Sequence, residues 1–414
     1  MTLKKNLKNH TFSSFCKWLF ICASIGILSG IASSLFLVSL EWVTQLRSEN
    51  TWLLFLLPLG GLLIGFLYKK YDSEISKGNN LILETYENPG SKLAFKLAPS
   101  IFFSTLITHL FGGSAGREGT AVQMSTAIAD QFSNKFSLTT NERKTLLIIG
   151  ISAGFAAVFG TPLAGAVFAL ELLYFSKISL KSIVPALFTA YVAHYTVYYL
   201  GVEHTQYTIH SIPEIKATHL IWMAAAAVIF GIAARLFSRT THFLSNQFRK
   251  HIKNPILRPV LGGIILVGLF QFSLFSKYMG LGIPVIQEAF VTQSSSFDFI
   301  LKIAFTALTL GCGFKGGEVT PLFFMGATLG SALSGIIPIP IAILAAVGFV
   351  ALFAGATHTP VASTLMAMEL FGWEIGVLAA IGCFVAYLFS GRIGIYSSQV
   401  VGGIKIRLYE LLGL

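Results

Sequence analysis

The stretch of the chain that decides its fold runs from Val319 to Met368 and reads VTPLFFMGATLGSALSGIIPIPIAILAAVGFVALFAGATHTPVASTLMAM. These fifty residues contain no Asp, Glu, Lys or Arg. A helix that crosses a bilayer needs about 20 mostly apolar residues. A soluble core does not need apolar segments of this length, so the stretch predicts helices embedded in a membrane.

The composition of the whole chain supports that prediction. Of 414 residues, 54% are hydrophobic and 11% are charged, whereas a soluble domain has about 25% charged residues. Further stretches without formal charge are residues 18–40, 145–170 and 217–234. They are uniformly apolar, and a transmembrane barrel would alternate apolar and polar residues. We therefore predict an all-α polytopic membrane protein.

The net charge of +11 has its origin at the ends of these apolar segments. Basic residues flank the segments, as positively charged cytoplasmic loops do, which argues against binding of nucleic acid. The flanking residues are Lys4, Lys5, Lys8, Lys17, Lys69, Lys70, Arg143, Lys144, Arg249, Lys250, Lys253 and Arg258. The pattern predicts a cytoplasmic N-terminal segment, 1–17, and residues 405–414 form a short tail. The run 18–40 is longer than the apolar region of a signal peptide, about 7–15 residues, so we expect a retained helix.

An internal repeat is indicated by three pairs of segments in the same order. Residues 78–84 resemble 282–288, and TPLAGAVFALEL (161–172) resembles TPVASTLMAMEL (359–370), with six of twelve residues identical. Between them, four residues recur 200 positions later: Gly113, Gly116, Glu118 and Thr120 as Gly313, Gly316, Glu318 and Thr320. Such repeats are typical of transporters with a central substrate site. We expect one transmembrane domain, 18–404, with repeats at about 18–245 and 255–392.

The direction of the repeats follows less directly from the charges. A cytoplasmic N-terminus and a basic connection at 249–258 favour an even number of crossings between the halves. The charge pattern alone therefore favours parallel repeats.

The first candidate site is the glycine-rich loop 112–116, which leads into Arg117, Glu118 and Gly119 and then an apolar run. Backbone amides at a helix N-terminus favour an anion. Glu118 can occupy such a place as a tethered anion, and protonation would let it leave, which couples a proton to an anion. The alternative is a carboxylate that caps its own helix. A charge at membrane depth is costly, which favours the functional interpretation.

The second loop, 313–321, has the same design. Glu318 stands in it at the place that matches Glu118 in this alignment, and Pro321 suits a first helical turn. Lys315 is either the ion-pair partner of a nearby carboxylate or a marker of the membrane edge.

Three further residues offer hydrogen-bond donors. Asn79 and Asn80 carry side-chain amides that can donate to a small anion, or they form an ordinary Gly-Asn turn. Tyr396 offers a phenol near the end of the last apolar segment, although alone it is typical of an interfacial aromatic residue.

Together, these residues resemble the CLC family of anion channels and transporters over nearly the full chain. Residues 116–119, GREG, match the family string whose glutamate is the external gate. Residues 316–321 stand where the family has its Gly-Gly-x-Phe-x-Pro loop, Gly78-Asn79-Asn80 stand where chloride-selective members have Gly-Ser-Gly-Ile-Pro, and Tyr396 matches the inner tyrosine.

The departures from the family pattern resemble its bacterial fluoride/proton antiporter branch. Thr120 replaces a proline, Asn79 a serine and Val319 a phenylalanine, Glu318 is an added acid, and Leu172 stands where chloride exchangers carry an inner proton-transfer glutamate. The resemblance implies inverted repeats with short and broken helices that meet at a central anion site.

The resemblance also implies roles for individual residues. Glu118 would be the gate and proton carrier, with Glu318 and Thr320 as a central polar station. The residues expected to contact the anion are Asn79, Val319, Tyr396, Gly116, Arg117 and Gly119.

We therefore expect a fluoride/proton antiporter in the cell membrane of a bacterium, with both termini cytoplasmic, a homodimeric assembly, and no metal or cofactor. The alternatives are a chloride/proton exchanger or passive chloride channel of the same family. An intramembrane enzyme with His358 as its base is a remote alternative.

Overall fold

The computed structural model describes residues 2–71, 75–90, 92–173, 180–207, 209, 216–399 and 404–411. This part of the chain is helical and forms no β-strand. The α-helices are α1 (Thr2–Glu49), α2 (Leu57–Tyr71), α3 (Asn79–Glu87), α4 (Leu97–Leu110), α5 (Glu118–Asp130), α6 (Phe132–Lys135), α7 (Thr140–Phe159), α8 (Pro162–Leu173), α9 (Leu180–Tyr199), α10 (Ala217–His251), α11 (Leu257–Phe270), α12 (Ile283–Glu288), α13 (Asp298–Gly311), α14 (Val319–Leu333), α15 (Ile341–Thr357), α16 (Pro360–Phe371), α17 (Gly376–Phe389) and α18 (Ile404–Leu411). Short 3₁₀ helices cover Thr51–Leu56, Ile75–Lys77, Ser273–Tyr278 and Trp373–Ile375.

Few of these helices are long enough to cross a bilayer. Three described segments have the length and composition to do so: Ser14–Glu49, Thr51–Lys70 and Ala217–His251. Other apolar helices, such as α14 and α16, have 10–17 residues, fewer than the roughly 20 that a span requires. The ends of such short helices lie inside the protein, where their free backbone groups can face an ion.

The ends of several helices follow from local sequence. Thr139 and Glu142 form a reciprocal capping box at the start of α7, and Gly160 ends that helix in the left-handed conformation. A proline at the first position begins both α8 and α16. Pro321 lies in the first turn of α14, as the sequence predicted.

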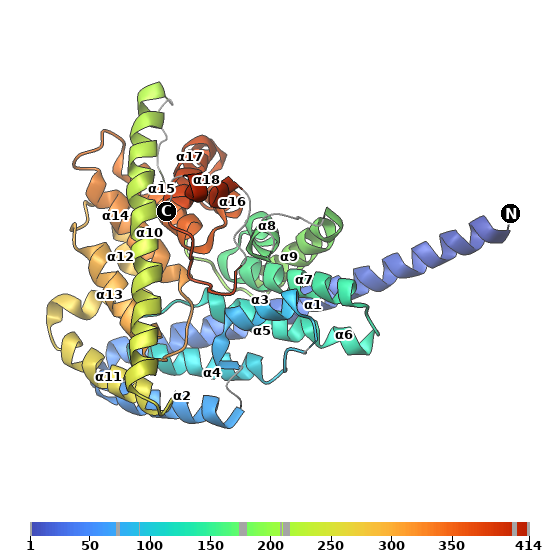
Figure 1. The fold of residues 1–414 in the computed structure, drawn as a ribbon, viewed down its shortest axis with the longest axis horizontal. Helices are drawn as coiled ribbons and strands as arrows, with labels where there is room; N and C mark the ends of the chain where they lie inside the picture. Colours follow the sequence, from blue (N-terminus) through green and yellow to red (C-terminus); the bar gives the residue numbers. More distant parts are fainter. Residues whose placement is uncertain are drawn as a thin grey trace.

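The two halves of the chain pack in the same way. The contacts of α4 with α5 and of α7 with α8 recur as those of α13 with α14 and of α15 with α16. In the same scheme α1 packs on α9 and α10 packs on α17, and Figure 1 shows α1 and α10 as the long helices of their halves. We therefore propose that α10 opens the second repeat, which then begins near Ala217 and not near residue 255.

The register between the halves corrects the sequence alignment by one position. Helices α4, α5 and α7 begin 201 positions before α13, α14 and α15. Glu118, the first residue of α5, is thus equivalent to Val319, and Glu318 is equivalent to Arg117. The alignment at 200 positions matched identical residue types, whereas the structure matches the places where the helices begin.

Equivalent helices of the two halves also contact each other reciprocally. The Glu171 carboxylate accepts hydrogen bonds from the backbone N–H of Val361 and Ala362, at 3.0 and 2.8 Å. Its equivalent, Glu369, accepts from Leu163 and Ala164, at 2.9 and 2.8 Å. Contacts that are exchanged in this way are the mark of a two-fold relationship, and they confirm the third pair of repeated segments.

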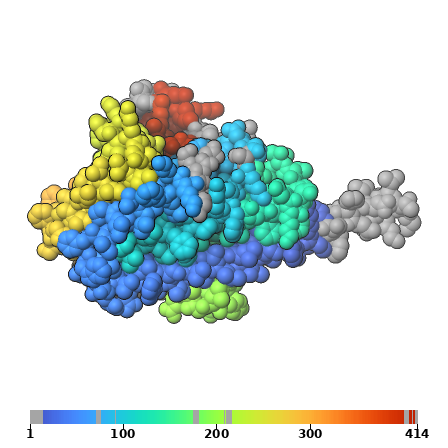
Figure 2. Space-filling model, turned by 90° about the horizontal axis from the view of Figure 1, so that it is seen from below, coloured from blue at the N-terminus to red at the C-terminus, as the bar shows by residue number. Residues whose placement is uncertain are grey.

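A second reciprocal contact joins α2 and α11. A Cβ atom added to Gly61 would lie 2.6 Å from the carbonyl oxygen of Pro259, and one added to Gly263 would lie 3.0 Å from Cα of Pro58. The helices approach this closely because glycine leaves room for the facing backbone. Figure 2 shows this face of the molecule, where the blue N-terminal half borders the yellow part of the second half.

A buried ion pair fixes the far end of α5. Asp130 is fully buried and receives two hydrogen bonds from the Arg143 guanidinium, at 2.7 and 2.8 Å. The backbone N–H of Leu93 donates to the same carboxylate at 2.8 Å. A bidentate pair with a third donor satisfies the carboxylate well, so α5 is held firmly against the start of α7.

Candidate functional site

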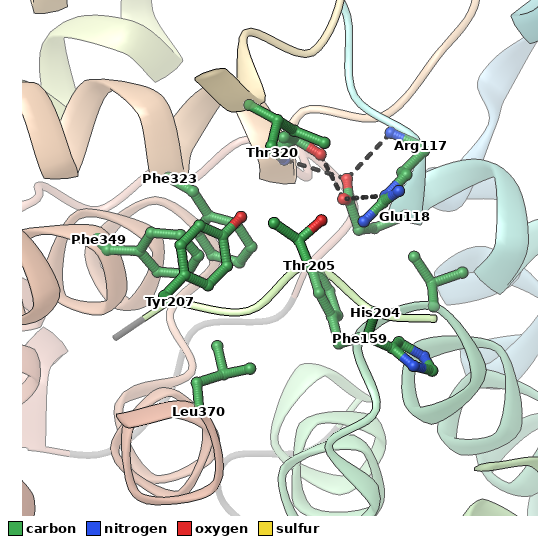
Figure 3. Close-up of a pocket in the computed structure, with 12 residues that line it drawn as sticks. Arg117, Glu118, Phe159, His204, Thr205, Tyr207, Thr320, Phe323, Phe349 and Leu370 are labelled. Carbon is green, nitrogen blue, oxygen red and sulfur yellow. Dashed lines mark hydrogen bonds and ion pairs between the residues drawn. The ribbon is translucent and has the colours of Figure 1, made fainter. Parts of the chain in front are cut away.

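The Glu118 side chain crosses from its own helix to the other half of the protein. Its Oε2 accepts a hydrogen bond from the backbone N–H of Thr320 at 3.0 Å, and its Oε1 accepts one from the Thr320 hydroxyl. The Arg117 backbone N–H also donates to Oε2 at 3.0 Å, and the Arg117 Nε lies 3.7 Å from Oε1. Glu118 is 1% exposed. Its carboxylate therefore occupies an anion position at the N-terminus of α14, shown in Figure 3, and does not cap α5.

The two glycine-rich loops are joined by a pair of backbone hydrogen bonds. Gly116 N–H donates to the Gly317 carbonyl at 2.6 Å, and Gly317 N–H donates to the Gly116 carbonyl at 2.7 Å. A Cβ on Gly116 would lie 2.9 Å from Glu118 Oε2, and one on Gly317 would lie 2.8 Å from the Gly119 nitrogen. Side chains at these positions would separate the loops, so the glycines are required for Glu118 to reach α14.

Glu318 lies next to this junction, at the residue that precedes α14. It makes no side-chain capping hydrogen bond with that helix, which argues against a purely structural capping role. Its Oε2 would be 3.7 Å from a Cβ on Gly119, and its charge interacts with those of Glu118 and Lys315. The structure thus brings both predicted glutamates to one place, although they are not equivalent in the repeat.

Asn79 and Tyr396 lie beside the glutamates. Asn79 begins α3 after Gly78, whose φ of +60° requires glycine, and a Cβ on Gly119 would lie 3.0 Å from Asn79 Nδ2. Tyr396 is 5% exposed and interacts with the Asn79 side chain and with the charges of Glu118 and Glu318. It is therefore a buried residue of the site and not an interfacial aromatic.

Two other candidates of the sequence have structural partners. The Asn80 Oδ1 accepts from the backbone N–H of Ser398 at 3.0 Å, which fixes the segment that carries Tyr396. Lys315 Nζ donates to the Ser76 carbonyl at 3.1 Å and lies 4.5 Å from the centre of the Tyr68 ring. No ion pair of Lys315 with a carboxylate within 4.0 Å forms in the described ranges.

The place of the inner proton glutamate is apolar in this chain. Leu172 is 4% exposed, and its carbonyl accepts from Gln399 Nε2 at 3.4 Å. The neighbouring acid, Glu171, is committed to the start of α16. Leu172 has no ionisable group and the Glu171 carboxylate is bound to the backbone of α16, so Glu318 is the second acid that lies beside Glu118.

Sequence reasoning missed the hydroxyl groups that support the site. Thr105 and Thr120 share a hydrogen bond of 2.7 Å behind α5, and Ser114 and Thr306 share one of 2.9 Å across the halves. The buried Lys302 donates to the carbonyls of Tyr278 and Gly280, at 3.0 and 2.9 Å. Their only signal in the sequence is polarity within apolar helices, which does not identify a partner.

No metal centre is formed by the residues that the structure describes, since three or more His, Cys, Asp or Glu side chains never gather in a metal-binding group there. His358 is 2% exposed, ends α15 in the left-handed conformation with φ of 58°, and packs edge-on against Tyr387. The chemistry of the site is therefore that of a carboxylate seated at a helix N-terminus and surrounded by amide and hydroxyl donors.

An all-helical membrane fold with a carboxylate seated at an interior helix N-terminus is typical of a polytopic ion transporter. The family model described as voltage-gated chloride channel matches residues 60–391, and the chain belongs to this family, the CLC proteins. A "Chloride/fluoride channel protein" of Pseudomonas syringae pv. tomato is 43% identical over 395 residues, which are 94% of this chain and 87% of that protein.

Solved structures agree with this assignment. The crystal structure of a CLC-type fluoride/proton antiporter superposes with a TM-score of 0.90 at 33% identity and covers 93% of this chain and 98% of its own. A slow cyanobacterial Cl⁻/H⁺ antiporter, at 20% identity, has the same fold, with a TM-score of 0.78 over 96% of this chain and 98% of its own. Membership of the family confirms the inverted arrangement of repeats, and the parallel arrangement that the charge pattern favoured is wrong.

Proposed function

We propose that this protein exchanges fluoride for protons across the membrane. The observation that carries the proposal is the Glu118 carboxylate seated at the N-terminus of α14 by the backbone and hydroxyl of Thr320. A carboxylate that takes up a proton loses its charge and with it most of its attraction to the helix N-terminus. An anion can then take its place, so protonation and anion binding alternate at one position.

The donors around this position suit a small, strongly hydrated anion. Fluoride needs many hydrogen-bond donors to replace its water, and the site offers the Asn79 amide, the Tyr396 phenol and the amides at Val319 and Thr320. Gly116, Arg117 and Gly119 form the wall on the opposite loop. Glu318 repels the anion when ionised and donates a hydrogen bond to it when protonated, so its charge changes or remains neutralised during the cycle.

The direction of exchange follows from the chemistry of the substrate. Hydrogen fluoride is a weak acid that enters a cell as a neutral molecule and ionises inside. Expulsion of the trapped anion then needs an energy source, and inward protons supply it through Glu118. The relatives whose names include fluoride, at 43% and 33% identity, support this substrate.

Chloride/proton exchange and a passive chloride channel are the alternatives of the same class. Leu172 in place of an inner glutamate and Asn79 in place of serine count against the exchanger. The gate alone does not distinguish a channel from an antiporter. An enzyme is disfavoured because the chain's Gly-x-Ser-x-Gly string, residues 150–154, lies inside helix α7 and not at a strand-to-helix turn. Its serine, Ser152, donates to the Ala186 carbonyl at 2.9 Å.

The proposal extends to the oligomeric state and the membrane location of the protein. We place it as a homodimer in a bacterial cell membrane, with the basic N-terminal segment, 1–17, and the C-terminal tail, 405–414, in the cytoplasm. Each subunit would hold its own pathway, since the residues named above all come from one chain.

Efflux from liposomes tests the substrate. The purified protein is reconstituted, the liposomes are loaded with equal concentrations of fluoride or chloride, and release is followed with ion-selective electrodes. We expect fluoride to leave at least tenfold faster than chloride. The donors of the site are spaced for a small anion, and one hydrogen bond fewer to the larger chloride ion would cost about 1.5–3 kcal/mol. Equal rates would contradict fluoride selectivity and favour the chloride alternatives.

A further inference from the structure

A small cavity adjoins the Glu118 carboxylate on a side that Asn79, Glu318 and Tyr396 do not reach. Its walls are formed by Arg117, Glu118 and Thr320, by aromatic side chains, and by residues 204, 205 and 207, which connect α9 to α10 (Figure 3). Its free space accommodates about one sphere of the size of water. Fluoride has nearly that size, so the cavity fits one dehydrated ion.

The hydroxyl of Tyr207 points into this cavity from a fixed position. The Tyr207 ring packs against Phe290, Phe349 and Phe371, with centroid distances of 5.7, 5.2 and 6.2 Å. Its oxygen is turned toward Glu118 in Figure 3, and the charges of Arg117 and Glu118 act on it. The hydroxyl makes no hydrogen bond to the described part of the chain. A rigid donor without a protein partner is available to a ligand.

Thr205 supplies a second hydroxyl from the same connection. Its oxygen faces Glu118 in Figure 3 and has no hydrogen-bond partner among the residues that the structure describes. The position of Thr205 is fixed by its neighbour, because the His204 Nε2 lies 3.0 Å from the Ala157 carbonyl and the His204 ring covers Gly160. Gly160 has a φ of +73° and a Cβ there would lie 3.1 Å from that ring. The connection therefore holds both hydroxyls beside the gate.

We propose that this cavity is a second fluoride station, in which the hydroxyls of Thr205 and Tyr207 hold an ion next to the position of Glu118. The proposal rests on the proposed exchange of fluoride. Two hydroxyl donors replace water around the ion, and the Arg117 guanidinium, whose Nε is 3.7 Å from Glu118 Oε1, adds a positive charge. A fluoride ion displaced by the returning Glu118 carboxylate moves into this cavity. The station thereby lowers the free energy that the ion needs to leave the anion position at α14.

Substitution of the two hydroxyls tests the station. Tyr207→Phe and Thr205→Val are reconstituted in liposomes, and initial fluoride release is measured against internal fluoride concentration and compared with the flux of protons. Thr205→Ser keeps its hydroxyl, and Tyr199→Phe removes a phenol from a residue that is 82% exposed. We expect the KM for fluoride to rise about tenfold in Tyr207→Phe and in Thr205→Val. The number of protons per fluoride should stay the same, because Glu118 is unchanged.

The outcomes separate this inference from the proposed function. A KM in both variants equal to that of Tyr199→Phe, in a parent protein that exchanges fluoride for protons, would overturn the station and leave the exchange intact. A parent protein that releases chloride and no fluoride would instead contradict the proposed function, and the fluoride station with it. If Tyr207→Phe fails to fold, as judged by size exclusion, the comparison of Thr205→Val with Thr205→Ser decides the question. Equal KM values in that pair reject the station.

Discussion

Replacement of Glu118 by glutamine isolates the role of its charge, because the two side chains have the same shape. The carboxylate accepts three hydrogen bonds, from the backbone N–H and hydroxyl of Thr320 and from the backbone N–H of Arg117. Glutamine keeps one acceptor oxygen, which can take the two backbone N–H groups, and its amide nitrogen must instead donate to the Thr320 hydroxyl. A hydrogen bond to a charged group contributes about 1.5–3 kcal/mol and a neutral one about 0.5–1.5 kcal/mol, so the change from charged to neutral costs about 1 kcal/mol at each of the three contacts. The total of about 3 kcal/mol corresponds to roughly a hundredfold shift from the seated to the displaced side chain.

The consequence for transport is a loss of coupling. Glutamine cannot take up or release a proton, and its weaker seat leaves the anion position open more often. We expect Glu118→Gln to fold, to release fluoride down its gradient, and to move no protons with it. The assay records fluoride with an electrode and external pH in weakly buffered liposomes, with parent protein and empty liposomes as controls. A folded Glu118→Gln protein that still drives protons against a fluoride gradient would refute the assignment of Glu118 as the proton carrier.

Substitutions at three further positions test the surroundings of the gate and the far end of α5. Glu318→Ala and Glu318→Gln should nearly abolish fluoride/proton exchange with little change in thermal stability, because Glu318 makes no capping bond; full exchange in Glu318→Ala would assign the site to Glu118 alone. Thr320→Val, which removes one hydroxyl and keeps the backbone donor, should slow exchange several-fold, whereas Thr320→Ser should resemble the parent, and equal rates for the two would be evidence against the hydroxyl contact. Asp130→Asn should lower the free energy of unfolding by about 3 kcal/mol, because it leaves the Arg143 charge without its partner in a buried pair; thermal unfolding in detergent measures this, and an unchanged midpoint would contradict a stabilising role.

The sequence predicts that a helix opens at the glycine-rich loop before Glu118, but it aligns the two halves of the chain one residue out of register. A glycine-rich loop followed by Glu118 and an apolar run indicates the start of a helix, and α5 does begin at Glu118. Identical residue types placed Glu318 opposite Glu118, but the backbone bonds between Gly116 and Gly317 set the relationship at 201 positions. Short strings rich in glycine align almost as well one residue apart, and only the three-dimensional contact distinguishes the two registers.

Other parts of the site depend on contacts that no local pattern records. The pair Glu171 and Glu369 was visible as part of a repeated segment, yet their exchange of partners between α8 and α16 needs the two-fold packing. Tyr396 by itself looks like an interfacial aromatic residue, whereas in the structure it is 5% exposed and lies two residues before Ser398, which Asn80 binds. Tyr207 and Thr205 stand in a polar connection without any motif, so their approach to Glu118 could be found only in the structure.

The central claim is that protonation of Glu118 and binding of fluoride are coupled, and uphill transport tests it most directly. Liposomes with the reconstituted parent protein are prepared with equal fluoride inside and outside, and an inward proton gradient is then applied at zero membrane potential. Our account predicts that fluoride leaves the liposomes against its own growing gradient, and that Glu118→Gln shows no such movement. Fluoride that stays at its starting distribution in the parent protein under the proton gradient would contradict coupled exchange and identify a passive pathway.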